Sequence, residues 1–157
     1  MFGGKENKFM INPGIGKVLN ILPQRYPFLF IDRIVEFEKG KKVVVLKNVT
    51  ANESYFTGHF PQRPVMPGVL LIETMVQAGM IFLSLNSLAD IKDAKSADIY
   101  YLCSVKARFL KPAAPGDQVF VEIAPVKTTK DLGIVKAVAM VDGKEIARAE
   151  IAGARQK

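Results

Sequence analysis

Residues 57–68, TGHFPQRPVMPG, contain the single histidine of this 157-residue chain, His59. Three prolines in this stretch restrict the backbone around the imidazole, because the proline ring fixes φ. Fourteen residues after His59, Glu73 stands in the apolar stretch VLLIETMVQAG. A neutral imidazole can take a proton from carbon, and a buried carboxylic acid, whose pKa rises with desolvation, can give one. The two residue types therefore suit acid–base chemistry.

These groups would suffice to remove a proton beside a carbonyl and to expel a hydroxyl from the next carbon. The backbone N–H groups of Gly68 and Val69, at the start of an expected helix, would hold the carbonyl oxygen as it gains negative charge. Gln77 lies four residues after Glu73, on the same helical face. Each residue also has a structural alternative: Glu73 as a buried carboxyl bonded to backbone amides, and His59 as a loop side chain packed for shape.

A long helix is expected from Met66-Pro67-Gly68 to about Leu88. Apolar side chains surround it on nearly every face, so it must be enclosed by other elements. A short helix is expected between Asn12-Pro13 and Pro23. Strands rich in Val, Ile and Phe, separated by turn residues, are expected at 28–38, 42–50, 97–109, 118–127, 132–141 and 144–152. This order predicts an α+β fold in which a curved antiparallel sheet wraps one central helix.

The composition limits the class of protein. The formal net charge is +7, which makes an acidic partner plausible, and the basic residues are equally explained as a solvated surface. No zinc-finger, RNA-binding or recognition-helix pattern is present, so no nucleic-acid partner is expected. Cys103 is the only cysteine, which excludes an intrachain disulfide and fits a reducing compartment.

Two further expectations concern the ends and the location of the chain. The first residues lack the apolar region of a secretory signal, and the apolar run 69–85 is interrupted by polar side chains. A cytoplasmic protein without membrane insertion is therefore expected. Residues 1–11 are expected to form a flexible N-terminal tail, and residues 12–157 a single domain.

The chain resembles a known family over about residues 18–150. GHFPQRPVMPGVLLIETMVQAG, preceded by LPQRYPFLFIDRI and followed by KARFLKPAAPGDQV, is similar to the FabZ-type (3R)-hydroxyacyl-[acyl-carrier-protein] dehydratases, which adopt the hot-dog fold. The resemblance implies that His59 and Glu73 are the catalytic pair, that the Gly68 amide assists at the thioester carbonyl, and that a trans-2-enoyl thioester is the product. It implies no metal and no dissociable cofactor, since the phosphopantetheine belongs to the carrier protein.

The resemblance also implies an assembly and a partner. The family builds each site across a homodimer interface, with His59 of one subunit facing Glu73 of the next, and three dimers commonly form a hexamer. The substrate would arrive on acyl carrier protein, an acidic partner.

Further candidates concern the substrate and the carrier. Val69, Gln77 and Phe60 are candidate substrate-binding residues, and Tyr101 lies where related enzymes carry a tyrosine at the tunnel mouth. Three basic residues near a strand end could meet the carrier or simply solvate the surface: Lys106, Arg108 and Lys111. The segment YLCSVKARF is one residue shorter than in the family, which could alter the preferred acyl chain length.

Two other functions remain open from the sequence. A hot-dog thioesterase would cut acyl thioesters with an acidic residue and water, and it would release a free thiol. A non-catalytic acyl-binding module would use the same tunnel, but it would not need the pair formed by His59 and Glu73.

Overall fold

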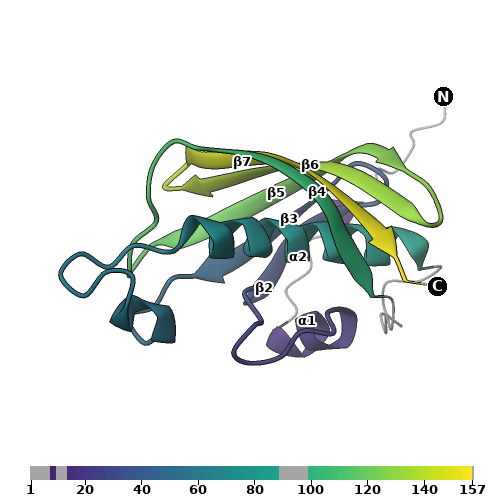
Figure 1. Ribbon diagram of the computed structural model, residues 1–157. Coiled ribbons are helices and arrows are strands. Elements are labelled where there is room, and N and C mark those ends of the chain that lie inside the picture. The colour runs from purple at the N-terminus through teal and green to yellow at the C-terminus, as the bar shows by residue number, and fades with distance from the viewer. Residues whose placement is uncertain (1–7, 10–13, 89–98, 157) are drawn as a thin grey trace.

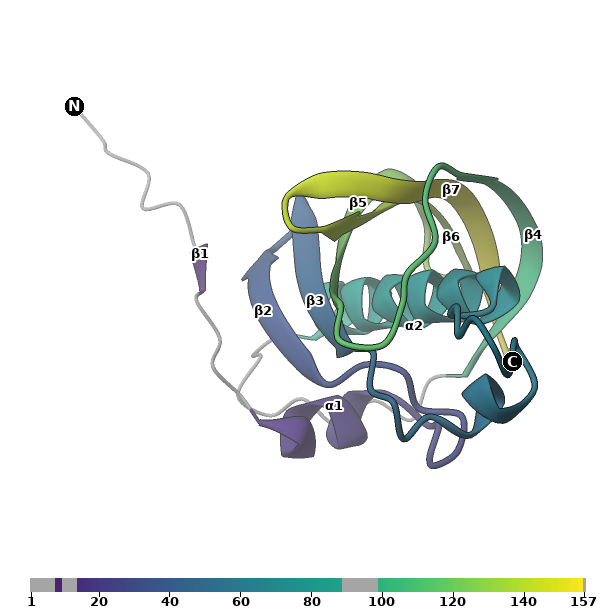
Figure 2. The same cartoon turned by 90° about the vertical axis from the view of Figure 1, so that its left-hand side faces the viewer.

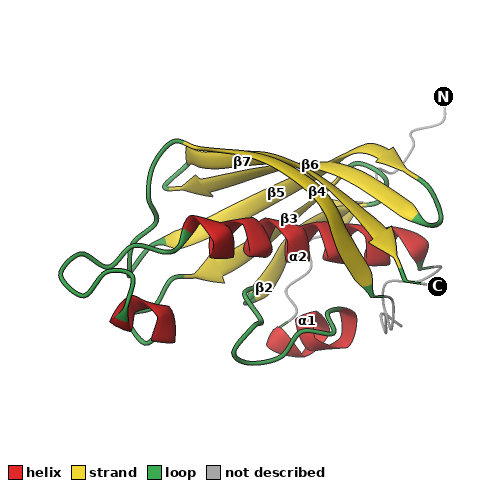
Figure 3. Cartoon of the chain, viewed as in Figure 1, coloured by secondary structure: helices red, strands yellow, loops and turns green. Residues whose placement is uncertain are grey.

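The computed structural model describes residues 8–9, 14–88 and 99–156 of the chain. Two α-helices, a short 3-10 helix and seven strands follow in the order β1 (Lys8–Phe9), α1 (Ile15–Ile21), β2 (Arg33–Glu38), β3 (Lys42–Asn48), η1 (Ser54–Thr57), α2 (Gly68–Ser87), β4 (Tyr100–Phe109), β5 (Gln118–Thr128), β6 (Leu132–Val141) and β7 (Lys144–Arg155). The result is an α+β domain in which one long helix lies within the curve of a sheet (Figure 3).

The strands form one antiparallel sheet in the order β1-β2-β3-β5-β6-β7-β4. The chain passes through β5, β6 and β7 as a meander, and β4 pairs with β7, so that β4 is one edge of the sheet. The sheet bends around α2, with β2 and β3 on one side and β4 on the other (Figures 1 and 2). This is the expected arrangement of a central helix wrapped by an antiparallel sheet.

The core lies between α2 and the concave face of the sheet. Side chains of α2 are buried on most of its faces, and they pack against alternate residues of the strands, such as Val43 and Val45 of β3. Among the described residues, α2 is the one helix long and apolar enough to cross a membrane, and 67% of its apolar window is buried inside the fold. Enclosure by the sheet therefore accounts for its apolar composition, as the sequence predicts.

Two glycines let α2 approach the sheet closely. A Cβ atom on Gly133 of β6 would lie 2.5 Å from a methyl carbon of Leu83, and one on Gly79 would lie 3.3 Å from Val135. A larger side chain at either position would require the Leu83 or Val135 side chain to shift. Elsewhere glycine forms a turn: Asp142 and Gly143 have φ of 50° and 72°, the pair of left-handed residues typical of a tight two-residue hairpin.

The strand positions agree with the sequence prediction except at the ends. The strand expected from Phe28 begins only at Arg33, because the backbone of Phe28 and Phe30 bonds instead to the side chain of Gln77. Residues 97–98 of the strand expected at 97–109 lie outside the described residues.

The N-terminal segment is described only in part. Most of the tail expected at 1–11 lies outside the described residues, as do Asn12 and Pro13 before α1. Within that segment, Lys8–Phe9 pairs with Phe37–Glu38 as the outermost strand of the sheet.

Candidate active site

His59 lies two residues after η1, in the loop between η1 and α2. Its N–H donates to the Tyr55 carbonyl at 2.9 Å, and its carbonyl accepts from Val65 at 3.1 Å. The ring Nδ1 lies 2.8 Å from the carbonyl oxygen of Val65. Because a carbonyl oxygen only accepts, Nδ1 carries the hydrogen, and Nε2 of the neutral ring keeps its lone pair. The loop therefore fixes the tautomer in which Nε2 can act as a base.

Phe60 restricts the imidazole from one face. The rings of His59 and Phe60 are stacked, with centroids 4.1 Å apart and planes inclined by 25°. Phe60 itself is 53% exposed in the single chain. An exposed apolar ring beside the imidazole could contact an apolar ligand, so Phe60 stays a candidate substrate-binding residue.

Glu73 lies half-buried on the second turn of α2, and its position is fixed by Gln77. Nε2 of Gln77 donates to Oε1 of Glu73 at 2.9 Å, and the same amide nitrogen donates to the carbonyl of Phe28 at 2.8 Å. Oε1 of Gln77 accepts from the N–H of Phe30 at 2.9 Å. Gln77 is fully buried, so these bonds satisfy a polar group that would otherwise be costly in the core. The role of Gln77 is to hold Glu73.

The environment of Glu73 favours its protonated form. Burial raises the pKa of the carboxyl above its ordinary value, and the hydrogen bond from Gln77 offsets this in part. A carboxyl that keeps its proton to a higher pH is suited to act as a general acid.

The start of α2 offers unpaired N–H groups. Within the described chain, the amides of Gly68 and Val69 have no hydrogen-bond acceptor, whereas the next two amides bond to the carbonyl of Pro67. Val69 is 72% exposed. A Cβ on Gly68 would lie 3.1 Å from the ring of Phe109 at the end of β4, so this turn packs directly on the sheet edge. Two free N–H groups and the positive end of the helix dipole suit an oxygen that gains negative charge.

The two candidate catalytic side chains make no direct polar contact with each other within the described residues of the single chain. Gly68, Val69 and Glu73 lie in the first two turns of α2, and the buried Gln77 follows one turn later. The same described residues contain no group of three or more His, Cys, Asp or Glu side chains that could hold a metal ion.

A narrow apolar cavity begins one turn after Glu73. It has a volume of about 20 Å³ and lies between α2, from Val76 to Leu83, and the ends of β4, β6 and β7. Tyr101 lines it and is 57% exposed, so this tyrosine lies beside the cavity and away from His59.

A basic groove of about 700 Å³ crosses β4, β7 and β6 on the sheet face turned away from α2. Lys106 and Arg108 line it, as two of the three expected docking residues, whereas Lys111 is exposed outside it. The sequence reading missed Lys136 and Arg148 in the same groove. Each alternates with buried residues of its strand, and this alternation could have revealed their shared outer face.

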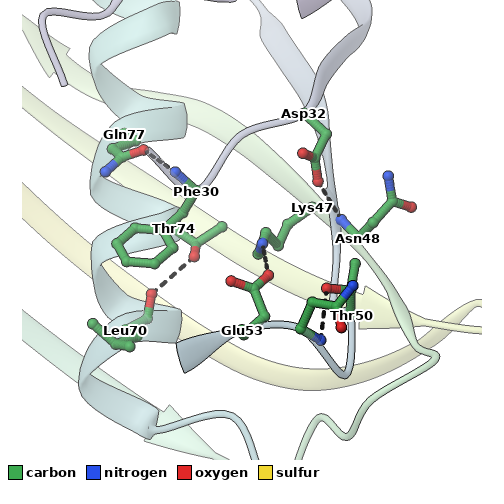
Figure 4. A network of polar contacts seen from close by, with 10 residues as sticks. Phe30, Asp32, Lys47, Asn48, Thr50, Glu53, Leu70, Thr74 and Gln77 are labelled. Carbon is green, nitrogen blue, oxygen red and sulfur yellow. Dashed lines mark hydrogen bonds and ion pairs between the residues drawn. The ribbon is translucent and has the colours of Figure 1, made fainter. Parts of the chain in front are cut away.

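The sequence analysis also did not predict a pair of charged side chains at the start of η1 (Figure 4). Lys47 is buried on β3 and forms an ion pair with Glu53, the residue before η1. The hydroxyl of neighbouring Tyr55 is buried without a hydrogen-bond partner among the described residues, and its pKa is raised by burial and then by Glu53. The signal that could have found this group is a lysine at an inward-facing position of an otherwise apolar strand.

Comparison with known families gives one match that covers most of the chain. Residues 22–150 match the FabA-like domain. A protein from Magnetococcus marinus with the name 3-hydroxyacyl-[acyl-carrier-protein] dehydratase FabZ is 43% identical over 90% of this chain and 90% of its own length. Proteins of the same name from Burkholderia thailandensis (45% identity, 90% and 87% covered) and Aliivibrio fischeri (41%, 98% and 98%) are similar to it as well.

Solved structures support the fold. The dehydratase heterocomplex ApeI:P from Xenorhabdus doucetiae superposes with a TM-score of 0.75 at 16% identity, covering 89% of this chain and 91% of the other. The PaaI protein of the Escherichia coli phenylacetic acid degradation operon gives 0.60 at 19%, covering 80% and 79%. At these identities the likeness concerns the fold alone.

Proposed function

The chain belongs to the FabZ dehydratases of the FabA-like family, and we propose that it removes water from a (3R)-3-hydroxyacyl chain carried on acyl carrier protein, leaving a trans-2-enoyl thioester. The reaction is a step of fatty acid elongation. As proposed, it needs no metal and no dissociable cofactor, and it takes place in the cytoplasm.

The proposed mechanism uses one base, one acid and one oxyanion site. Nε2 of His59 takes the proton from the carbon beside the thioester carbonyl, and the electron pair forms the new double bond. The bond from the next carbon to its hydroxyl breaks as Glu73 gives its proton to the departing oxygen, which leaves as water. The Gly68 amide, with Val69 beside it, donates to the carbonyl oxygen while that oxygen carries negative charge.

One observation carries this proposal: the first two turns of α2 combine the free amides of Gly68 and Val69 with a carboxyl whose pKa is raised by burial. The locked tautomer of His59 supplies the complementary base. Dehydration beside a carbonyl needs this combination of acid, base and oxyanion donors.

The direct test supplies purified protein with a 3-hydroxyacyl carrier and follows absorbance together with free thiol. The expected result is a rise in absorbance from the conjugated enoyl thioester without release of thiol. Thiol release would instead indicate the thioesterase alternative, and binding without any reaction would indicate the acyl-binding module.

We further propose that two copies complete each site. Among the described strands, β4 is a sheet edge without a second neighbour, and it has exposed apolar side chains, including Leu102, Val105 and Phe109 at 46%, 38% and 48% exposure. Unpaired edges of this kind are protected in stable proteins, and pairing with a second β4 would continue the sheet. Because Phe109 contacts Gly68, a copy on this edge comes close to Glu73, where its own His59 loop would supply the base.

Val105→Lys is expected to convert the oligomer to a monomer and to reduce activity sharply, since each copy would place a charge on the apolar edge proposed to form the interface. Size-exclusion chromatography with light scattering measures the mass, and it also tells a dimer from a hexamer. Val126→Lys, at an exposed position of β5, is the matched control and should keep the wild-type mass. A fully active monomeric variant would contradict the shared site.

The acyl chain is proposed to enter beside α2 at the apolar cavity, whose volume of about 20 Å³ holds about one water molecule, so the lining side chains must move apart to admit the chain. The cavity begins one turn beyond Glu73, so a chain whose third carbon lies at the carboxyl would extend along Val76 and Leu83. Tyr101 stands at the side of this path, in keeping with a position near the mouth.

The carrier protein is proposed to dock on the basic groove. Lys106, Arg108, Lys136 and Arg148 line it with a single acidic residue, Glu150, which makes the groove complementary to an acidic partner. Arg108 precedes Phe109, whose ring contacts Gly68, so the groove lies behind the site on the same strand.

Arg108→Glu is expected to raise KM for the carrier-bound substrate on the order of tenfold, because a like charge would face the acidic carrier. KM for a pantetheine thioester without the protein should remain within about twofold of wild type, since that substrate does not use the groove. Lys144→Glu, an exposed charge reversal at the start of β7, is the control. An equal rise for both substrates would place Arg108 at the acyl site instead.

A further inference from the structure

Lys47 is a buried cation that the proposed reaction does not use. Its residue exposure is 5%, and its side chain shares the inward face of β3 with Val43 and Val45. The ammonium pairs with the carboxylate of Glu53 and lies 6.0 Å from the centroid of the Phe30 ring. A buried ion pair is costly to desolvate and is often no more stabilising than apolar residues of the same volume. Stability alone is therefore a weak explanation for it.

One side of the pair supports the loop that carries His59. Glu53 is the residue before η1, and its carbonyl accepts the N–H of Phe56 at 3.1 Å. The short helix is bonded directly to the proposed base, because the carbonyl of Tyr55 accepts the N–H of His59 at 2.9 Å. The position of the Glu53 backbone thus sets the start of η1, and η1 holds the backbone of His59 through the carbonyl of Tyr55.

Lys47, the other member of the pair, lies beside the residues that hold Glu73 in place. The Phe30 ring lies beside the Lys47 ammonium, and the Phe30 N–H donates to Oε1 of Gln77 at 2.9 Å. Gln77 in turn donates to the carboxyl of Glu73 at 2.9 Å. Figure 4 shows Lys47 and Glu53 below the segment that carries Phe30, with Gln77 on the adjacent helix.

We propose that Lys47 and Glu53 form a positioning pair for the active site: the ion pair ties β3 to η1, fixing the direction of the His59 imidazole, and seats Phe30 against Gln77. The inference rests on the proposed function, in which His59 and Glu73 are the reacting groups. Neither member of the pair contacts the substrate in this scheme. Their effect is on the orientation of the base and the acid, where a displacement of about 1 Å can cost on the order of a hundredfold in rate.

The test separates positioning from folding with three variants. Lys47→Met leaves the partly buried Glu53 carboxylate without its cation, and Glu53→Gln leaves the buried Lys47 ammonium without its anion, so both should unfold at a lower temperature than the wild type. The double variant Lys47→Met/Glu53→Leu removes both charges and should recover much of that thermal stability. If the pair positions the site, the double variant still loses at least about tenfold in kcat, with KM within about twofold of wild type.

The single histidine supplies a readout that does not depend on activity. Because the chain has one imidazole, its NMR signals belong to His59, and the Nδ1 hydrogen bonded to Val65 reports the ring's orientation. In the double variant this hydrogen should exchange faster with water and the ring signals should shift. Lys42→Met is the control on β3: it removes a partly exposed cation that pairs with Glu36 of β2 and Glu122 of β5, and it should leave the spectrum and kcat unchanged.

The possible outcomes are distinct. A stable double variant with wild-type kcat and an unchanged His59 spectrum would overturn the positioning role. If the double variant does not fold, the His59 signals of the folded fraction of Glu53→Gln are measured instead. Changed signals would support the positioning role, and unchanged signals would overturn it. If the wild type shows no dehydration, the proposed function fails, while the His59 spectra still decide whether the pair orients the ring.

Discussion

His59→Ala is expected to lower kcat by at least about a hundredfold while the protein remains a folded oligomer. The imidazole is half-buried at the surface of a loop, so its loss creates no large core cavity. The substitution removes Nε2, the proposed proton acceptor. In the wild type, the hydrogen bond from Nδ1 to the Val65 carbonyl keeps Nε2 unprotonated in the neutral ring. The measurement is the steady-state rate on a 3-hydroxyacyl carrier, with the oligomer mass and thermal unfolding recorded for the same sample.

Gln62→Ala, at an exposed position of the same loop, is the matched control and should keep its rate within about twofold, as is usual for surface substitutions away from a site. Retention of wild-type activity by His59→Ala would remove the imidazole from the mechanism. Unfolding of the variant, with normal activity in the fraction that stays folded, would support a packing role for the ring.

Glu73→Gln is expected to cause a loss of similar size, on the order of a hundredfold or more. Glutamine keeps the size of the side chain and can still accept the hydrogen bond from Gln77, but it cannot protonate a departing hydroxyl. In the wild type, activity should fall as pH rises through the raised pKa of Glu73, since the acid form is lost. The residual activity of the variant should lack this alkaline limb.

The same substitution should change stability in the opposite direction from activity. Because burial raises the folded-state pKa of Glu73 above its ordinary value of 4.5, its contribution to stability is fully present below that value. The contribution is lost as pH rises through the folded-state pKa, where the buried carboxyl must ionise. Glu73→Gln should therefore gain thermal stability relative to wild type as pH is raised from acid to neutral.

Thermal unfolding of both proteins across this pH range measures the effect, with Glu122→Gln on β5 as a control carboxyl. An unchanged rate in Glu73→Gln would exclude Glu73 as the acid. A constant stability difference across the pH range would show that its carboxyl does not titrate differently in the folded and unfolded states.

Much of this architecture could be predicted from local patterns. Apolar side chains on nearly every face of 68–87 require an enclosing layer, and the turn residues Gly40 and Asp142-Gly143 separate the strands that provide it. The start of β2 could not be predicted in this way. Phe28 and Phe30 favour a strand, but the amide of Gln77, from a distant segment, satisfies their backbone groups and keeps them out of the sheet.

The candidate site could be predicted by residue type and not by geometry. His59 and Glu73 stand out because a rigid histidine and a carboxyl in an apolar helix are uncommon, whereas the bond from Nδ1 to Val65 depends on the loop's folded path. Lys47 gave no local signal of its partner, since the pairing requires the chain to turn back after β3. The basic groove was found in part, because residues of three strands meet there only in the assembled sheet.

The sheet order has a consequence for synthesis on the ribosome. β4 follows α2 in the chain, yet its strand neighbour is β7, so that Tyr100 pairs with Arg155 and Phe109 with Ala147. Such non-local pairing forms late, because the intervening chain must first be closed into a loop. A nascent chain therefore cannot seat β4 until β7 has emerged, and the edge proposed to join two subunits becomes available only after the rest of the sheet is made. This order of events would protect growing chains on one messenger from associating prematurely.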